Sequence, residues 1–435
     1  MSQPTSLQAY VDAVEQTTPW QWQGRVVQVV GGLVESEGPF CSVGERCEIT
    51  STGGVYPGEI VGFRGNVVLS MPLDKPSGIR FGDAVRTWGA VPSLAVGPEL
   101  LGRVIDGTGR PLDDAGPLRY TSWRALDQAA PLPMSREPIR VALGCGVRAI
   151  DGFVPCGRGQ RIGIFGGSGV GKSTLIGMMT RGTAADMTVL ALVGERGREV
   201  REFIESLGPE GVRRSVVVVS TSDQSPLLRI RAALAATAVA EYFSALGRHV
   251  LLVVDSLTRF AMAQREIGLA AGEPPTAKGY TPSVLTMLAR LLERAGSFER
   301  GSITGFYTVL MEGDDQQDPL VDTVRSLVDG HIVLDRRLAA ANHYPPIAVL
   351  DSLSRLAGSV CPPEHLEKMR RLRGLLAAYA KSEDLVRIGA YQKGADATLD
   401  RALEVLPEIQ KYLQQTAREA APLAANRERL LALPS

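Results

Sequence analysis

The chain has 435 residues, of which 44% are hydrophobic and 22% charged, an ordinary composition for a globular protein of two or three domains. Lysine plus arginine and aspartate plus glutamate each number 47, so no net charge draws the chain to nucleic acid or to acidic lipid. Five scattered cysteines without a CxxC pair argue against a disulfide framework or a zinc site. With no apolar run near the ~20 residues of a membrane helix and no secretory signal, we expect a cytoplasmic protein.

The first segment, residues 1–20, is polar with a single apolar stripe. The stripe follows helical spacing and consists of Leu7, Tyr10, Val11 and Val14. This pattern predicts a short amphipathic helix. Such a helix either caps its own domain or docks on a partner or a membrane surface.

Residues 21–95 have a different sequence pattern, made of short apolar runs and turns. Short valine-rich runs are separated by glycine turns such as Gly31-Gly32, and the runs are RVVQVV, EIVGF, NVVLS and AVRTW. Strands at this spacing without a long helical pattern predict a small all-β barrel or sandwich. A passage rich in proline and glycine, residues 97–138, then leads to the next unit.

Residues 96–358 alternate between apolar strands and helical stretches. RIGIF, TVLALV, SVVVVS and HVLLVVD are almost wholly apolar, as expected for strands buried on both faces. The pattern predicts an α/β domain with a mainly parallel sheet and helices on both sides. From residue 359 to residue 435 we expect a helical domain, with helices over HLEKMRRLRGLLAAYA, LDRALEVL and IQKYLQQTAREAA.

The strongest motif is FGGSGVGKST, which satisfies the phosphate-loop pattern G-x-x-x-x-G-K-[ST] between a predicted strand and a predicted helix. Its glycines let backbone N–H groups turn toward phosphate oxygens, and the following helix aims its positive end at the same place. Lys172 would neutralise the phosphates of ATP and Ser173 would ligate Mg²⁺. The predicted nucleotide-binding residues are Gly166, Gly167, Ser168, Gly169, Val170, Gly171, Lys172, Ser173 and Thr174.

Charged residues follow two other apolar runs. Asp255 ends HVLLVVD, where its carboxylate either holds Mg²⁺ with Ser173 or caps the next helix. Glu195 and Arg196 follow TVLALVG and either polarise the attacking water and touch a phosphate or remain solvated loop charges. Arg355 in VLDSLSR is a surface arginine unless it reaches a neighbour's nucleotide.

Several longer stretches together resemble the rotary-ATPase superfamily, and within it the type III secretion ATPases, most of all the flagellar export ATPases. The likeness runs from about residue 24 to at least residue 359. The stretches that carry it are GVRAIDGFVPCGRGQRIGIFGGSGVGKST, VGERGREVREF, LLVVDSLTRFAMAQREI, KGYTPSV, LLERAG, GSITGFYTVLMEGDDQQDP, DGHIVLDRRLA and HYPPIAVLDSLSR.

The resemblance implies a small N-terminal β-barrel, a central RecA-like P-loop ATPase domain and a C-terminal helical domain, assembled as a hexamer. It implies that Glu195 is the catalytic carboxylate with Arg196 beside it, that Tyr344 stacks on adenine, and that Arg355 enters the adjacent subunit's site. One position departs from the pattern, because Asp351 stands where flagellar and secretion relatives commonly carry alanine.

The leading functional hypothesis is an ATPase that energises protein export through a flagellar-type apparatus, located peripherally at the inner membrane. The partners expected from the resemblance are regulator and stalk proteins, chaperone–cargo complexes and a membrane export gate. An injectisome ATPase and a proton-coupled synthase catalytic subunit are the alternatives. An RNA translocase is disfavoured, because residues 21–90 lack interleaved basic and aromatic residues.

The acidic stretch EGDDQQDP, residues 312–319, lacks the spacing of a calcium-binding EF-hand loop. We expect a loop at the ring's interior or at the edge of the nucleotide site, with Pro319 fixing its exit. Within the resemblance, its two glutamines favour flagellar export over the injectisome.

Overall fold

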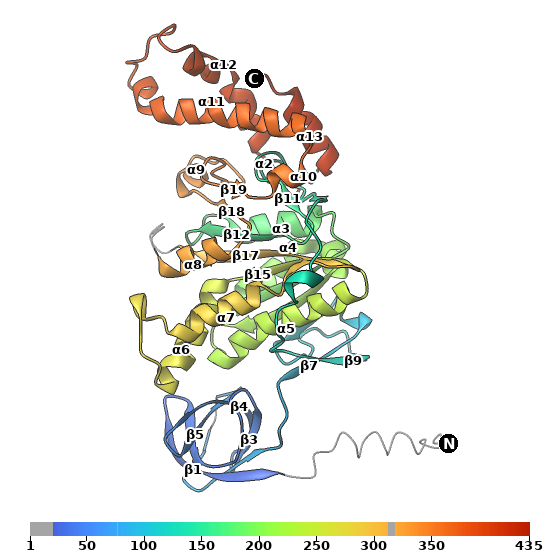
Figure 1. The fold of residues 1–435 in the computed structure, drawn as a ribbon, viewed down its shortest axis with the longest axis vertical. Coiled ribbons are helices and arrows are strands. Elements are labelled where there is room, and N and C mark those ends of the chain that lie inside the picture. The colour runs from blue at the N-terminus through green and yellow to red at the C-terminus, as the bar shows by residue number, and fades with distance from the viewer. Residues whose placement is uncertain (1–20, 76, 312–317) are drawn as a thin grey trace, which may run out of the picture.

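The structure, a computed structural model, describes residues 21–75, 77–311 and 318–435. The predicted helix over residues 1–20 and most of the acidic stretch, residues 312–317, lie outside the described residues. The chain is arranged in three layers along its long axis, with strands at one end, a mixed sheet in the middle and helices at the other end (Figure 1). None of the helices in the described ranges is both long and apolar enough to cross a membrane.

The N-terminal layer is a closed barrel with strand order β1-β2-β5-β4-β3-β6. Inward side chains alternate with outward ones, and the barrel core includes Val26, Val34, Ile49 and Val85. This confirms the predicted small β-barrel. The strands are β1 (Trp22–Val30), β2 (Leu33–Glu37), β3 (Arg46–Ser51), β4 (Gly54–Arg64), β5 (Val67–Pro72) and β6 (Ala84–Thr87).

The central layer is a mainly parallel sheet of order β19-β18-β12-β17-β15-β13-β14-β8, with the short β16 (Gly296–Ser297) beside β17. Only β19 and β16 pair antiparallel within it among the described strands. The path strands are β8 (Val104–Asp106), β12 (Arg161–Gly166), β13 (Met187–Glu195), β14 (Ser215–Thr221), β15 (His249–Asp255), β17 (Ser302–Leu310), β18 (Gly330–Val333) and β19 (Leu353–Ser354). Two smaller sheets pair β7 (Ser93–Val96) with β9 (Ser122–Ala125), and β10 (Ala142–Leu143) with β11 (Cys156–Gly157).

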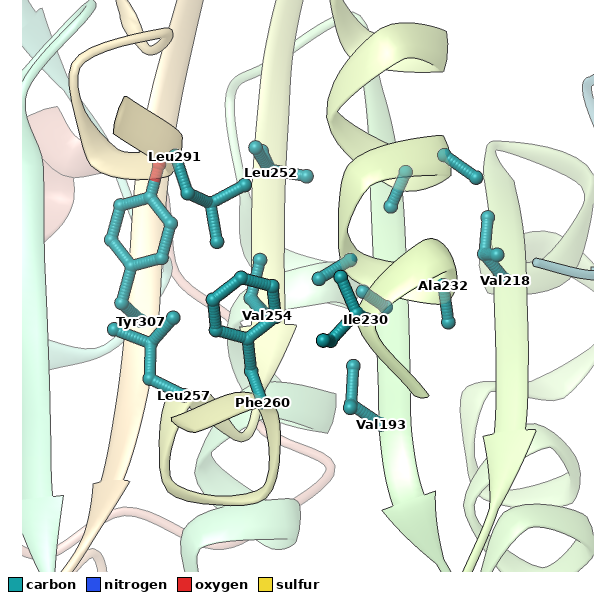
Figure 2. Packing of buried hydrophobic residues seen from close by; sticks show 14 of the residues in the cluster. Val193, Val218, Ile230, Ala232, Leu252, Val254, Leu257, Phe260, Leu291 and Tyr307 are labelled. Atoms are coloured by element: carbon teal, nitrogen blue, oxygen red, sulfur yellow. The ribbon is translucent and has the colours of Figure 1, made fainter. Parts of the chain in front are cut away.

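Helices cover both faces of the central sheet, as predicted. Along β13, Val189, Ala191 and Val193 belong to one core cluster, while Leu190 and Leu192 belong to another. The first cluster includes side chains from α5 (Pro226–Ala245), α6 (Leu257–Ala271), α7 (Pro282–Leu292) and α8 (Pro319–Leu327). The second includes α2 (Arg148–Phe153), α3 (Lys172–Gly182) and α4 (Gly197–Arg213). Figure 2 shows the first cluster, with Phe260 of α6 lying between Tyr307 of β17 and Ile230 of α5.

The C-terminal layer consists of α11 (Pro363–Arg387), α12 (Ala397–Leu413) and α13 (Leu423–Ala432), reached through α9 (Arg336–Ala340) and α10 (Ala357–Val360). The expected helical domain is therefore present, but the helix expected over IQKYLQQTAREAA ends at Leu413. The residues after it leave the helix because their backbone groups bond to the central domain instead, starting with the Gln415 N–H and the Tyr344 carbonyl, 2.8 Å apart.

Candidate active site

The phosphate-loop motif forms a turn between β12 and α3, as the sequence predicts. Gly169 and Gly171 have φ angles of 75° and 99°, in the left-handed region that favours glycine. These conformations turn the loop around the N-terminal end of α3, where backbone N–H groups favour an anion. Lys172 Nζ donates to the Gly166 carbonyl at 2.9 Å and also to the Gly167 carbonyl, so its ammonium group lies against the loop.

Two carboxylates lie at the same edge of the sheet. Glu195 ends β13 and Asp255 ends β15, and these strands are parallel neighbours, with Leu192 paired to Asp255. The carboxyl ends of parallel strands are where such sheets bind ligands. A cavity of about 740 Å³ is lined by Glu195 and Asp255 together with Ser173 of the phosphate loop. The structure thus brings together three side chains that lie far apart in the sequence.

Burial and neighbouring charge shift the protonation of both carboxylates. Burial raises the pKa of Glu195 to about 7, the negative charge of Asp255 adds to the increase, and Arg259 opposes it. Burial also raises the pKa of Asp255, while a hydrogen bond from Thr308 Oγ1, 2.6 Å from Asp255 Oδ1, and the charge of Lys172 act in the opposite direction. A carboxylate with a pKa near 7 can accept a proton at neutral pH.

Asp255 does not cap the following helix, so the alternative interpretation of this residue as an N-cap is wrong. The N-cap of α6 is Ser256, whose Oγ accepts a hydrogen bond from the Arg259 N–H at 3.3 Å. The Asp255 side chain instead points into the domain, where it is buried beside Thr308 of β17. One of its oxygens is engaged by Thr308, and hard cations such as Mg²⁺ prefer oxygen ligands of this kind. Ser173 and Asp255 therefore fit a magnesium ion held between loop and strand.

Three other predicted site residues, Arg196, Tyr344 and Arg355, are not among the described residues that line this cavity. Arg196 is exposed just before α4. It forms an ion pair with Glu199, with Arg196 Nη1 and Glu199 Oε1 3.5 Å apart. Tyr344 is 43% exposed, and a Cβ placed on Gly171 would lie 3.8 Å from its ring, so the ring is beside the phosphate loop. Arg355 is exposed after β19, and its Nη2 lies 3.3 Å from the Arg325 carbonyl oxygen. Among described residues, the cavity lining does not include Arg355.

Three residues near the carboxylates were missed by the sequence analysis, namely Arg259, Glu199 and Thr308. Arg259 packs against Gly194, where an added Cβ would lie 3.2 Å from the Arg259 Cβ, and its charge acts on both carboxylates. The motif DSLTRF offered a signal, because an arginine in the first turn after Asp255 stays near the strand end. Thr308 lies in an apolar run and gave no such signal.

A phosphate loop, two strand-end carboxylates and a shared cavity define the class of P-loop nucleotide-binding proteins. Three family models match this chain. "ATP synthase alpha/beta family, nucleotide-binding domain" matches residues 146–354, and "ATP synthase alpha/beta family, beta-barrel domain" matches residues 26–89. "T3SS EscN ATPase C-terminal domain" matches residues 361–432.

Individual proteins agree with these matches. The chain is 50% identical to the flagellum-specific ATP synthase of Bacillus subtilis over 96% of both chains. It is 49% identical to the type 3 secretion system ATPase of Xanthomonas euvesicatoria, over 90% of this chain and 89% of that one. The solved structure of assembled EscN from enteropathogenic E. coli, in complex with its central stalk EscO, superposes with a TM-score of 0.86 at 41% identity, covering 94% of this chain and 98% of EscN. The chain belongs to the family of flagellum-specific ATP synthases and type 3 secretion system ATPases.

Proposed function

We propose that this protein hydrolyses ATP and that hydrolysis energises protein export through a flagellar-type (type III) secretion apparatus. The observation that carries the proposal is the single cavity that joins the phosphate loop at Ser173 to the carboxylates Glu195 and Asp255. An injectisome-type ATPase remains the alternative, since the identities to a flagellar and a secretion relative are 50% and 49%.

In this proposal each residue has a defined role. The loop N–H groups and Lys172 hold the β- and γ-phosphates, Ser173 and Asp255 hold the magnesium ion, and the ring of Tyr344 stacks on the adenine base. Bound magnesium would neutralise part of the charge on the phosphate oxygens. Glu195 accepts a hydrogen bond from the attacking water, because burial has brought its pKa into the neutral range.

Replacing Glu195 tests the catalytic assignment directly. Glu195→Gln keeps the size of the side chain but removes the proton acceptor, so we expect Mg-ATP affinity to change less than about twofold while phosphate release falls by about 100-fold or more. Equilibrium binding and a phosphate-release assay measure the two quantities. Glu210→Gln, an exposed glutamate of α4 outside the cavity lining, is a matched control that should keep full activity. Turnover retained by Glu195→Gln would remove Glu195 from the catalytic role.

We further propose that six copies form a ring and that Arg355 acts on the nucleotide of a neighbouring copy. Arg355 is exposed and is not among the described residues that line the cavity of its own copy, which supports an action between subunits. Arg196 is proposed to contact phosphate from within the same copy. Specific activity should then rise with protein concentration, and Arg355→Ala should flatten the rise by removing the cation that offsets γ-phosphate charge. Equal specific activity at all concentrations in the unsubstituted protein would contradict this assignment, as would an unchanged rise in Arg355→Ala.

The proposed partners are a central stalk, an export regulator, chaperone–cargo complexes and a membrane export gate, with the protein on the cytoplasmic side of the inner membrane. The stalk is the best supported of these, because the similar EscN assembly was solved with its central stalk EscO. Identification of the proteins that co-purify with the native ring tests the set. Flagellar export components would support the leading hypothesis, and injectisome components or synthase stalk subunits would replace it.

A further inference from the structure

The segment between α12 and α13 contains one buried glutamine. We call residues 414–419 the linker. Gln415 is 4% exposed, although Gln414, Thr416 and Ala417 beside it are exposed. Its side-chain Nε2 donates to the Gly146 carbonyl at 2.8 Å and to the Glu419 carbonyl at 2.7 Å, and its Oε1 accepts from the Arg148 N–H at 2.9 Å. A buried amide that uses both its donor and its acceptor groups specifies one backbone arrangement.

The linker is also held by two arginines of the central domain. Arg148, itself buried, donates from Nε to the Tyr412 carbonyl at 2.8 Å and from its other nitrogens to the Gln414 carbonyl and the Glu419 carboxylate. Arg181, in the last turn of α3, donates from Nη2 to the Ala417 carbonyl at 2.6 Å. Because α3 begins at the phosphate loop, the linker is fixed relative to the nucleotide-binding helix.

The same linker holds the backbone that carries Tyr344. The Gln415 N–H donates to the Tyr344 carbonyl at 2.8 Å, and the Gln414 side-chain amide lies 3.4 Å from Nδ1 of His343. The Tyr344 ring is 43% exposed, so packing alone constrains it weakly. The backbone hydrogen bond from the linker is therefore one of the contacts that hold the ring beside Gly171.

We propose that Gln415 is a positioning residue for the base of the bound nucleotide, acting through the linker and Tyr344. The inference rests on the proposed ATP binding and on the proposed stacking of Tyr344 on the base. Without the Gln415 side chain the linker loses its bonds to the Gly146 carbonyl and the Arg148 N–H, and the backbone N–H that holds the Tyr344 carbonyl is less firmly placed relative to the phosphate loop. Ala417 and Arg418 of the linker also line the cavity beside the carboxylates, but in the proposed function the phosphates are held by the loop and Lys172, with which Gln415 forms no hydrogen bond. Affinity for the base should therefore fall while affinity for the phosphate chain stays constant.

The test compares ATP with inorganic tripolyphosphate, a ligand that has the phosphate chain and lacks the base. In Gln415→Ala we expect the Kd of Mg-ATP to rise about tenfold and that of Mg-tripolyphosphate to change less than about twofold. The KM for ATP should rise in parallel while kcat stays within about twofold, since the catalytic carboxylates are untouched. Gln410→Ala, an exposed glutamine on α12, is the matched control and should change none of these values.

Two further measurements test the inference even if the Gln415→Ala variant does not fold. Gln415→Glu keeps the shape and the acceptor but lacks the donors to Gly146 and Glu419, so it should show the same selective loss for ATP. In the unsubstituted protein the backbone N–H of Gln415 should exchange its hydrogen more slowly with ATP bound than with tripolyphosphate bound. Base stacking on Tyr344 would stabilise the backbone carbonyl to which this N–H donates. Equal exchange with both ligands would overturn the inference.

The outcomes also separate this inference from the proposed function. Tyr344→Ala should weaken ATP about tenfold and leave tripolyphosphate unchanged. If Gln415→Ala weakens both ligands equally, the residue supports the phosphate site or the whole fold, and the inference is wrong. If Gln415→Ala weakens ATP but Tyr344→Ala does not, Gln415 does not act through Tyr344, and the inference fails while the ATPase proposal stands. Failure of the unsubstituted protein to bind either ligand would refute the proposed function itself.

Discussion

The barrel and the C-terminal helical domain both attach to the central domain through a buried arginine, but the two arginines hold different groups. At the barrel, Arg231 of α5 pairs with the carboxylate of Glu59 on β4, with Nη2 and Oε2 2.7 Å apart. At the helical domain, Arg148 bonds mainly to backbone carbonyls of the chain after α12, beside the buried amide of Gln415. The arginine at the barrel pairs with a side chain, whereas the arginine at the helical domain fixes a backbone path.

The two attachments differ in whether their hydrogen bonds continue to the residues of the proposed nucleotide site. The Arg231–Glu59 pair contacts neither the phosphate loop nor Tyr344, so the barrel can be held without constraining the nucleotide. The Arg148 network continues through Gln415 to the Tyr344 carbonyl. A movement of the helical domain would therefore displace the proposed base site, while a movement of the barrel would not.

The largest expected effect is at Arg148. Arg148→Ala removes several buried hydrogen bonds and leaves the carbonyls of Tyr412 and Gln414 without their donor, so we expect a loss of about 3 kcal/mol in the free energy of unfolding. The KM for ATP should rise as well. Urea unfolding and steady-state kinetics measure both values. Arg371→Ala, which breaks an exposed ion pair on α11, is the matched control with an expected loss below about 1 kcal/mol.

A smaller effect is expected at the barrel. Glu59→Gln keeps the shape of the side chain but leaves the Arg231 guanidinium without a counter-charge, which should cost about 2 kcal/mol of stability. The KM for ATP should not change. Gln23→Ala, which removes a hydrogen bond with Arg86 between two strands of the barrel, is the control. A raised KM in Glu59→Gln would contradict the contrast between the two interfaces.

The smallest expected effect is a shift in the pH profile of kcat/KM. Substitutions at the two interfaces should not produce this shift. If Glu195 acts as proposed, as an ionised carboxylate with a pKa of about 7, kcat/KM should rise with pH through about 7 and then level off. Arg259 lowers that pKa, and Arg259→Gln should therefore move the rise to higher pH by up to about one unit. Glu59→Gln serves as the control with an unmoved profile. A shift to lower pH in Arg259→Gln would exclude Glu195 as the titrating group.

The layers of the fold and the core of the candidate site could be predicted from the sequence, because their signals are local. The glycines and Lys172 of the phosphate loop stand within one short motif, and the apolar runs before Glu195 and Asp255 place both carboxylates at strand ends. The confirmed barrel and parallel sheet follow from the same kind of periodic pattern. The roles of Tyr344, Arg196 and Arg355 came from the family resemblance and stay predictions.

The remaining features depend on contacts that no local pattern encodes. The bond between the Arg148 N–H and Gln415 joins residues 267 positions apart, and the one between Thr308 and Asp255 spans 53 positions. A helix was expected past Leu413 because the sequence continues to favour one, but the backbone there binds the Tyr344 carbonyl and Arg148 instead. Tertiary hydrogen bonds outweighed helix propensity at that point.

The strand β8 is the end strand of the central sheet, next to β14. It comes from the passage rich in proline and glycine that follows the barrel, yet it pairs with β14, so the last strand of the ATPase sheet is supplied by a segment that precedes the phosphate loop. A fragment starting at residue 144 would keep the nucleotide-binding residues but leave the apolar run SVVVVS with an unpaired edge. Such an edge is a template for pairing between chains. The segment that joins the two domains therefore also shields the edge of β14 from strand pairing with another chain.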